Sequence, residues 1–364
     1  MDESFAGATE RYERWLGAQC RLVPEGLAAK RDKMGDSAFA FLRGTFYRWA
    51  HAFAATDARL HAAPKILCVG DVHLENFGTW RDAEGRLVWG VNDFDEAAEL
   101  PFTSDLVRLA ASAFLEAGRT DRFRPSRAET VDAILRGYRK GLRKGGRPFV
   151  LEDRQAELRD MGAASGADAK KAWKKYRAQG EADASDLDPV MRDLLLTCLP
   201  SGATHVSFFR RLSGLGSLGR VKVVAIAEWS GGWVAREAKA AAPSAVHMDG
   251  PGHPSPLGDY RRIEALAVRA RDPFLYLSES WIVRRLSPEA DKIEVSKVEE
   301  APRQEILLGA MGRELANVHL GTAGRADPLS AFLDGLGEGD GWLLHAAASA
   351  AERVEADYEA FRAG

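Results

Sequence analysis

The sequence predicts an α+β fold with two lobes, a larger one rich in helices and a smaller one built on a sheet. Three observations support this prediction. The chain has 364 residues, which is more than one small hydrophobic core needs and is typical of about two domains. Apolar residues recur at helical spacing over most of the chain. From residue 205 to residue 240, by contrast, strand-like runs are separated by glycine-rich turns.

The first 60 residues are predicted to be helical. Apolar side chains recur every three or four residues between residues 39 and 53, which places them on one face of a helix. Ser37 precedes this stripe and suits the N-cap position, because its hydroxyl can accept a hydrogen bond from a free backbone amide. The stripe consists of Phe39, Leu42, Phe46, Trp49 and Phe53.

The next segment, residues 61–200, is predicted to form most of the helical lobe. A short buried strand at 66–69 leads to Asp71, and the alternating segment 85–91 is a second strand. Helix returns at 103–115, where Thr103 or Ser104 can serve as the cap.

Residues 125–197 are predicted to be largely helical as well. Within them, 168–186 is densely charged, which favours a pair of helices exposed to water. The lysines between residues 170 and 175 are expected to belong to that exposed surface, although a phosphate-binding role is an alternative.

The smaller lobe is predicted at residues 201–290. Strands are expected on both sides of the glycine-rich stretch at 214–219, and a hairpin turn at 230–232 leads to a strand that ends at Lys239. A helix at 261–271 and a strand at 281–286 follow. The remaining residues, 291–364, are expected to form helices at 305–319 and 343–361 that pack on the larger lobe.

Composition excludes several classes of protein. The formal net charge is −3, so no overall positive field attracts nucleic acid. No apolar run approaches the roughly 18 residues of a membrane span, and the N-terminus lacks the pattern of an export signal. The cysteines Cys20, Cys68 and Cys198 form neither a zinc motif nor a disulfide framework. We therefore expect a cytoplasmic protein, with Cys68 buried in its strand.

The segment from residue 70 to residue 97 carries the strongest functional signal. Asp71 and Asn76 stand five positions apart with His73 between them, and Asp93 follows a strand in the run N-D-F-D. In kinase-type phosphoryl transfer an aspartate accepts the proton of the acceptor hydroxyl, whereas an asparagine and a later aspartate bind Mg²⁺. This assigns Asp71 to catalysis, and Asn76 and Asp93 to the metal. The alternative is that these residues only form turns.

A second group of residues suggests a nucleotide site. The glycine loop, with Gly214, Gly216, Ser217 and Gly219, lies between two strands, whereas a dinucleotide-binding motif opens a helix. A glycine-rich hairpin can cover the phosphates of ATP with its backbone amides. Lys239 ends the next strand, where kinases place the lysine that binds the phosphates.

Glu264 lies on the predicted helix that follows Lys239, and we expect its carboxylate to pair with this lysine. The order of the motifs is unusual, because in ordinary kinases the glycine loop precedes the catalytic loop. Circular permutation explains the reversed order and is tolerated where chain ends lie close together. The prediction is therefore a circularly permuted, protein-kinase-like two-lobe fold.

These motifs resemble those of domain-of-unknown-function family 2252, an uncharacterised bacterial family. The shared segments begin with R-G at Arg43 and continue with G-D-x-H-x-x-N-F-G and N-D-F-D-E-A. D-L-x-R-L-A-x-S starts at Asp105, and G-x-G-S-x-G and K-x-A-x-x-S come later, the last starting at Lys239. All occur in the same order, so the resemblance covers most of the chain.

The motifs around Asp71 and Asp93 are also similar to those of aminoglycoside and choline phosphotransferases, which have the protein-kinase-like fold. Those enzymes usually have a histidine before the Gly-Asp pair, where this chain has Val69. The bacterial family typically has a glutamate after its lysine, where this chain has Ala240. Neither departure removes a residue that the chemistry requires.

The resulting prediction is a phosphotransferase that uses ATP and Mg²⁺ and acts on a hydroxyl-bearing acceptor, which the sequence does not identify. His73 could bond backbone within the catalytic loop, and the alternative is a histidine that only packs there. Arg43 and Arg108 could contact the acceptor or organise the loop, and the alternative is that both are structural or surface arginines. Asp105 is expected to brace the loop, and Asp95 to be an additional metal ligand. The alternatives are a non-catalytic nucleotide-binding protein and a metal-dependent phosphohydrolase or nucleotidyltransferase.

Overall fold

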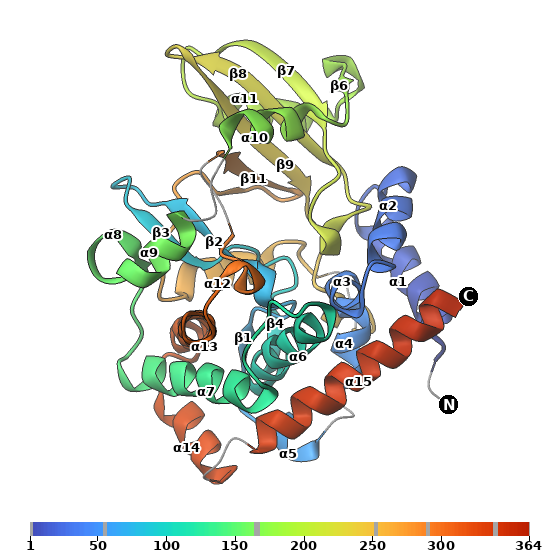
Figure 1. Cartoon of the computed structure of the whole chain (residues 1–364). Helices are drawn as coiled ribbons and strands as arrows, with labels where there is room; N and C mark the ends of the chain where they lie inside the picture. Colours follow the sequence, from blue (N-terminus) through green and yellow to red (C-terminus); the bar gives the residue numbers. More distant parts are fainter. Residues whose placement is uncertain are drawn as a thin grey trace.

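The fold is described from a computed structural model, which covers residues 3–53, 57–163, 168–250, 254–288, 292–337 and 341–363. A six-stranded sheet stands above a larger layer of helices, which also contains two smaller sheets (Figure 1). The α+β class predicted from the sequence is therefore correct.

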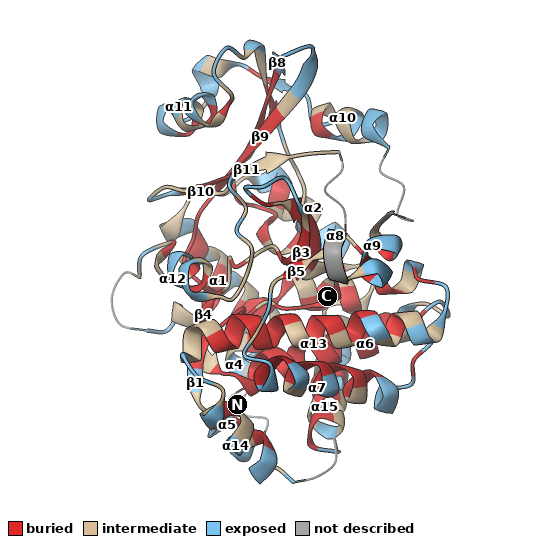
Figure 2. Cartoon of the chain, turned by 90° about the vertical axis from the view of Figure 1, so that its left-hand side faces the viewer, coloured by how far each residue is buried: buried red, intermediate tan, exposed pale blue. Residues whose placement is uncertain are grey.

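Three long helices form the centre of the helical lobe. The helix α13 (Ala301–Ala323) packs along α7 (Arg127–Arg143), and α6 (Thr103–Arg119) lies beside them. The closest approach is glycine against glycine, since a Cβ on Gly137 would come within 1.9 Å of the Gly309 carbonyl oxygen. The buried faces of these helices are almost continuous in Figure 2.

The N-terminal segment is helical, as predicted, but its apolar stripe is divided between two helices. Ser37 accepts a hydrogen bond from the Ala40 amide and so caps the first of them. The break falls at Thr45, whose backbone leaves the helical region and whose hydroxyl donates to the Phe41 carbonyl. The helices are α1 (Phe5–Gln19), α2 (Pro24–Met34), α3 (Ala38–Gly44), α4 (Phe46–Ala52) and α5 (Ala58–His61).

The strands of the helical lobe form two small antiparallel sheets. In one, β1 (Lys65–Cys68) pairs with β4 (Ala98–Pro101). In the other, β3 (Leu87–Val91) lies between β2 (Phe77–Arg81) and β5 (Phe149–Val150). Both sheets begin or end next to the predicted catalytic motifs.

The predicted cap of α6 is wrong. Its N-cap is Phe102, without a capping side chain. Thr103 and Ser104 lie inside the first turn, where the Thr103 hydroxyl donates to the Leu60 carbonyl and Ser104 accepts from the Trp49 indole. These two hydroxyls are therefore used to attach α4 and α5 to the lobe.

The large sheet has the strand order β10-β11-β9-β8-β7-β6, and all its pairings are antiparallel. The turn between β8 and β9 lies at Ser230 and Gly231, both with positive φ. The strands are β6 (Glu181–Ala182), β7 (Thr204–Arg210), β8 (Lys222–Trp229), β9 (Gly232–Ala240), β10 (Tyr276–Leu277) and β11 (Trp281–Leu286).

The charged segment 168–186 is not a helix pair exposed to water. Its only α-helix is α10 (Ala169–Arg177), after which the chain enters β6 and the short 3₁₀ turn η3 (Ala184–Asp186). Tyr176 of α10 packs on one side of the sheet, whereas α11 (Pro189–Cys198) packs on the other (Figure 2). The sheet lobe therefore begins well before residue 200.

The remaining helices complete the two lobes. The helix α12 (Gly258–Leu266) ends before the predicted residue 271. The ends of the chain meet, since the rings of Phe5 and Phe361 are 5.6 Å apart. Among the described residues no helix is both long and apolar enough to span a membrane. The others are α8 (Leu151–Arg154), α9 (Ala156–Ala163), α14 (Asp327–Gly335) and α15 (Gly341–Ala363).

Candidate functional site

Both groups of predicted site residues line one cavity of about 320 Å³ between the lobes. This volume is within the range of roughly 300–1,000 Å³ that is usual for ligand sites. Gly219 and Glu264 are the predicted site residues that do not line it. The lining includes Arg43, Asp71, His73, Asn76 and Asp93 from the helical lobe, and Gly214, Gly216, Ser217 and Lys239 from the sheet lobe.

The loop that carries Asp71 is attached to the core of the helical lobe by Asp105. One carboxylate oxygen of Asp105 accepts from the Val69 amide at 2.8 Å, and the other from the Gly70 amide at 3.0 Å. His319 on α13 contacts the same carboxylate at 3.0 Å. All four groups are buried, so Asp105 braces the loop in the way expected from the sequence.

Asp71 faces the cavity and is held by Arg108. The Arg108 guanidinium donates to both the Asp71 carboxylate and the Leu42 carbonyl. Burial raises the pKa of Asp71 to about 6, although the Arg108 charge acts against this rise. A carboxylate with this pKa is largely ionised at neutral pH and can still accept a proton, which suits a general base.

His73 and Asn76 shape the loop after Asp71. His73 Nδ1 accepts from the Glu75 amide at 3.1 Å and caps the short 3₁₀ turn η2 (Leu74–Asn76). The Asn76 side chain donates through Nδ2 to the Asp71 carbonyl at 2.8 Å. His73 therefore bonds backbone within the loop, as expected, and the hydrogen bond of Asn76 uses its side-chain nitrogen rather than its oxygen.

The β2–β3 hairpin brings the two predicted metal ligands to the same end. Phe77 is paired with Val91, and the Asn92 amide donates to the Asn76 carbonyl at 3.0 Å. Asp93 follows directly and receives its hydrogen bonds on Oδ1, from Lys239 and from the Asp95 amide. One amide oxygen and one carboxylate oxygen at the cavity fit Mg²⁺, which prefers few oxygen ligands from the protein.

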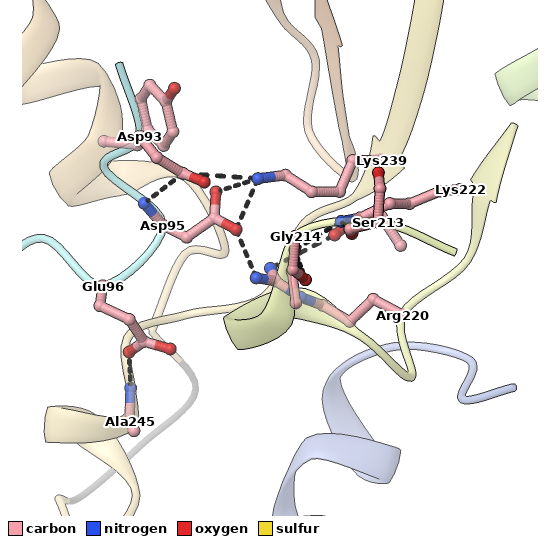
Figure 3. A network of polar contacts seen from close by, with 12 residues as sticks. Asp93, Asp95, Glu96, Ser213, Gly214, Arg220, Lys222, Lys239 and Ala245 are labelled. Carbon is pink, nitrogen blue, oxygen red and sulfur yellow. Dashed lines mark hydrogen bonds and ion pairs between the residues drawn. The ribbon is translucent and has the colours of Figure 1, made fainter. Parts of the chain in front are cut away.

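Lys239 crosses the cavity from β9 to the aspartates of the helical lobe (Figure 3). Its amine lies 3.4 Å from Asp93 Oδ1 and 2.7 and 2.6 Å from the two oxygens of Asp95. Asp95 also binds the Arg220 guanidinium. Burial alone would raise the pKa of Asp95, but the Arg220 and Lys239 charges hold it well below its usual range.

The expected pairing of Glu264 with Lys239 is wrong. Glu264 lies on α12, but its carboxylate is 3.4 Å from Arg269, whose guanidinium lies between the rings of Trp80 and Phe94. The partner of Lys239 is Asp95 instead. Asp95, which was expected to be an additional metal ligand, is occupied by two cations.

The glycine loop lies directly over Asp71. A Cβ on Gly216 would be 3.2 Å from both the Asp71 carboxylate and the Arg43 carbonyl, so only glycine allows this approach without a shift. The loop is fixed from behind by Lys222, whose amine donates to the Ser217 hydroxyl at 2.6 Å and to the Ser213 carbonyl at 2.5 Å (Figure 3). Burial lowers the pKa of Lys222 to about 7.

Several charged residues of the cavity were not predicted. Lys222 stands opposite Lys239 in the β8–β9 hairpin. The position of the turn at 230–231 fixes this pairing, so the turn was the sequence signal that could have located Lys222. Glu237 faces the cavity two residues before Lys239 and pairs with Arg211. Glu75 and Lys292 had no signal in sequence spacing, because their contact joins distant segments. The charged lining residues without a predicted role are Glu75, Glu96, Arg211, Arg220, Lys222, Glu237, Arg284 and Lys292.

A comparison with protein families finds a match over most of the chain. A family model described as "Uncharacterized protein conserved in bacteria (DUF2252)" matches residues 21–191 and 204–364. The two matched stretches include every predicted site residue. No curated protein and no solved structure matches the chain.

Proposed function

The chain belongs to the uncharacterised bacterial family DUF2252, and we propose that it is a phosphotransferase that uses ATP and Mg²⁺. One observation carries the proposal. Lys239, next to a glycine loop, lies 3.4 Å from Asp93 although 146 residues separate them in the sequence. A phosphate-binding lysine and a metal-binding aspartate in one cavity are the central parts of a phosphoryl-transfer site.

The order of elements in the sheet lobe supports a kinase-like arrangement. The glycine loop joins β7 to β8, Lys239 ends β9, and α12 connects β9 to β10. Kinases use the same succession of glycine hairpin, lysine strand and helix. The contact between the two ends of the chain supports circular permutation, because permuted relatives join these ends.

The proposed roles follow from the contacts. Asp71 orients the acceptor hydroxyl and takes its proton as the new bond from oxygen to phosphorus forms and the bond to ADP breaks. Arg108 holds the Asp71 carboxylate in place. Asn76 and Asp93 would hold Mg²⁺, which neutralises phosphate charge when it is bound. Lys239, oriented by Asp95, binds phosphate oxygens under the glycine loop.

The decisive experiment combines binding and turnover. Calorimetry should show ATP binding that is much weaker with a chelator than with Mg²⁺. Turnover against pooled metabolites and proteins, with ADP, AMP and pyrophosphate resolved, should yield ADP and a phosphorylated acceptor. Release of AMP would indicate nucleotidyl transfer, and release of phosphate without an acceptor would indicate a hydrolase. Binding without any turnover would support the non-catalytic alternative.

A further inference from the structure

Lys30, on the buried face of α2, carries a charge that no other side chain neutralises by contact. Three lysines are buried in the described part of the chain, namely Lys30, Lys222 and Lys239. Lys222 donates to Ser217, and Lys239 to Asp95. Lys30 is only 7% exposed, and among the described residues its ammonium makes neither a hydrogen bond nor an ion pair. It is therefore the buried lysine that lacks a counter-ion.

Two tyrosine rings stand against this ammonium. It lies 5.4 Å from the ring centroid of Tyr12 and 6.0 Å from that of Tyr47, and the two rings stack on each other at 4.3 Å. Burial lowers the pKa of Lys30 to about 8, so its charged form still predominates at neutral pH. Contacts with neutral rings recover only part of the hydration that a buried cation loses. The surroundings of Lys30 therefore favour an additional anion.

Lys30 lies against the wall of the cavity between the lobes. Both tyrosine rings line that cavity, and so does Gly44, on which a Cβ would be 3.6 Å from Lys30 Cε. A Cβ on Gly70, the residue before Asp71, would be 3.1 Å from Phe46, another lining residue. This part of the cavity is therefore adjacent to the proposed catalytic aspartate. We call it the tyrosine compartment, and it is lined by Tyr12, Gly44, Phe46, Tyr47 and Glu96.

The hydroxyl of Tyr12 is a second donor without a partner. Among the described residues it makes no hydrogen bond, whereas the hydroxyl of Tyr47 is bonded. Burial and the nearby Glu96 charge raise the pKa of Tyr12 well above its usual value, so its hydroxyl stays protonated and can donate. Glu96 itself accepts from the Ala245 amide at 2.7 Å instead of pairing with Lys30 (Figure 3).

A buried ammonium and a nearby hydroxyl that both lack an acceptor are the parts of an anion site. We propose that Lys30 and Tyr12 bind an anionic group, a phosphate or a carboxylate, in the tyrosine compartment, and that this group belongs to the acceptor. The flexible stem of a lysine allows its ammonium to reach such a group. The acceptor then carries this anion in addition to the hydroxyl that Asp71 activates. The assignment to the acceptor rests on the proposed function, whereas the anion site itself does not.

The neighbouring cations of α2 show what distinguishes Lys30. Arg31 is half exposed, and it is nevertheless paired with Glu13, at 2.9 and 2.6 Å. Lys33 is exposed and lies outside the cavity lining, so water can solvate its charge. Lys33 has the same side chain on the same helix as Lys30. It is therefore the matched control for substitution of the buried lysine.

The test titrates inorganic phosphate, and in a second series acetate, into the whole protein in a chloride buffer and measures binding by calorimetry. Because phosphate can also bind at Lys239, the reference protein carries Lys239→Ala. In this background Lys30→Met should weaken binding about tenfold or more, since a charge-assisted hydrogen bond is lost. Tyr12→Phe should weaken it severalfold, and Lys33→Met should leave it unchanged. The series with the tighter binding in the reference identifies the group as phosphate or carboxylate.

Urea denaturation provides a second measurement of the same site. Saturating phosphate should raise the urea midpoint of the reference, because the anion binds the folded state, but not that of the Lys30→Met variant. An equal rise in both proteins would place the anion elsewhere and overturn the site. Tyr12→Phe keeps the test valid if Lys30→Met fails to fold, since the hydroxyl that it removes has no partner among the described residues.

Two results of the titrations would also overturn the anion site. One is the absence of phosphate and acetate binding in the reference, and the other is unchanged binding by the Lys30 and Tyr12 variants. Failure of ATP binding would refute the proposed function, but would leave the result for the anion site unaffected.

Discussion

The two sides of the cavity are held in different ways. On the side of the helical lobe, the Asp71 loop is fixed by buried groups of its own lobe, chiefly Asp105 and Arg108. On the side of the sheet lobe, Lys239 and Arg220 are fixed mainly by Asp95, which belongs to the other lobe. The first arrangement is internal to one core, whereas the second connects the two lobes through charges.

This difference suggests that the two sides of the cavity have different functions. A group that must orient a reacting hydroxyl benefits from a rigid frame that does not depend on ligand. Charges that join two lobes can instead be exchanged for those of a ligand, because phosphate oxygens can replace carboxylate oxygens at Lys239. We therefore expect changes on the helical side to affect turnover and stability, and changes on the sheet side to affect nucleotide affinity.

The largest effect is expected for turnover in Asp71→Asn. Proton-accepting or orienting groups typically contribute about 10²–10⁴-fold in rate, so turnover should fall by that factor. Mg-ATP affinity should stay within about twofold, because Asp71 acts on the acceptor. Steady-state kinetics and calorimetry on the same preparation measure both. Full activity in a folded variant that binds Mg-ATP would remove the proposed mechanism.

Asp105→Ala should have the largest effect on stability. It removes the acceptor of two buried backbone amides and the partner of His319, a change that costs about 3–5 kcal/mol. Urea denaturation measures the loss. Ser112→Ala is the milder control, because it removes the acceptor of one buried amide, that of Leu74, and a hydroxyl that donates to the Leu109 carbonyl, but no charged group. If Asp105→Ala were no more destabilising than Lys239→Met, the contrast between the two sides would be wrong.

Lys239→Met should reduce Mg-ATP affinity about tenfold or more, since a charge-assisted contact contributes about 1.5–3 kcal/mol. Its effect on folding should be smaller than that of Asp105→Ala, because Asp95 keeps Arg220 as a partner. Lys174→Met, an exposed lysine of α10 outside the cavity, is the matched control. Equal affinities of the wild type and Lys239→Met would place the phosphates elsewhere.

Lys222 provides a test by pH. Burial lowers its pKa to about 7 from a usual value of 10.5, so between these values the unfolded chain binds more protons than the folded one. The stability of the wild type relative to Lys222→Met should therefore rise with pH above about 7, by at most about 1.4 kcal/mol per pH unit. Denaturation of both proteins from pH 6.5 to 9.5 measures the slope, and a constant difference would show that the lysine titrates normally.

Local sequence patterns predicted where helices and strands form better than they predicted which segments and side chains contact one another. The strand 281–286 and the cap at Ser37 were correct, because strand alternation and N-capping depend on neighbours in the sequence. The stripe at 39–53 was correct in its apolar face but not in its continuity, since Thr45 bonds back to Phe41 and allows a bend. The prediction for 168–186 was wrong because the buried residues of this segment, Tyr176 and Ala182, are few among many charged ones.

The candidate site shows the same limit. Asp71, Asn76 and Asp93 were found because they lie in one continuous motif on a hairpin. Lys239 was found through its own motif, and its meeting with Asp93 followed from the chemistry they would share. The partner of Lys239 was missed, since Asp95 and Glu264 are equally reasonable carboxylates in sequence. Glu264 lies beside Arg269 because α12 ends at Leu266, earlier than the sequence predicted.

The smallest effect is expected for nucleotide affinity in Glu264→Gln. If Asp95 has taken over the role of orienting Lys239, neutralising Glu264 should change Mg-ATP affinity by less than about twofold, whereas Asp95→Asn should weaken it clearly. Glu264→Gln should still reduce stability in urea, because it leaves the buried Arg269 without its counter-charge. Comparing affinity and stability in the two variants therefore separates orientation of the lysine from support of α12. A large loss of affinity in Glu264→Gln would show that this helix moves toward Lys239 when nucleotide binds.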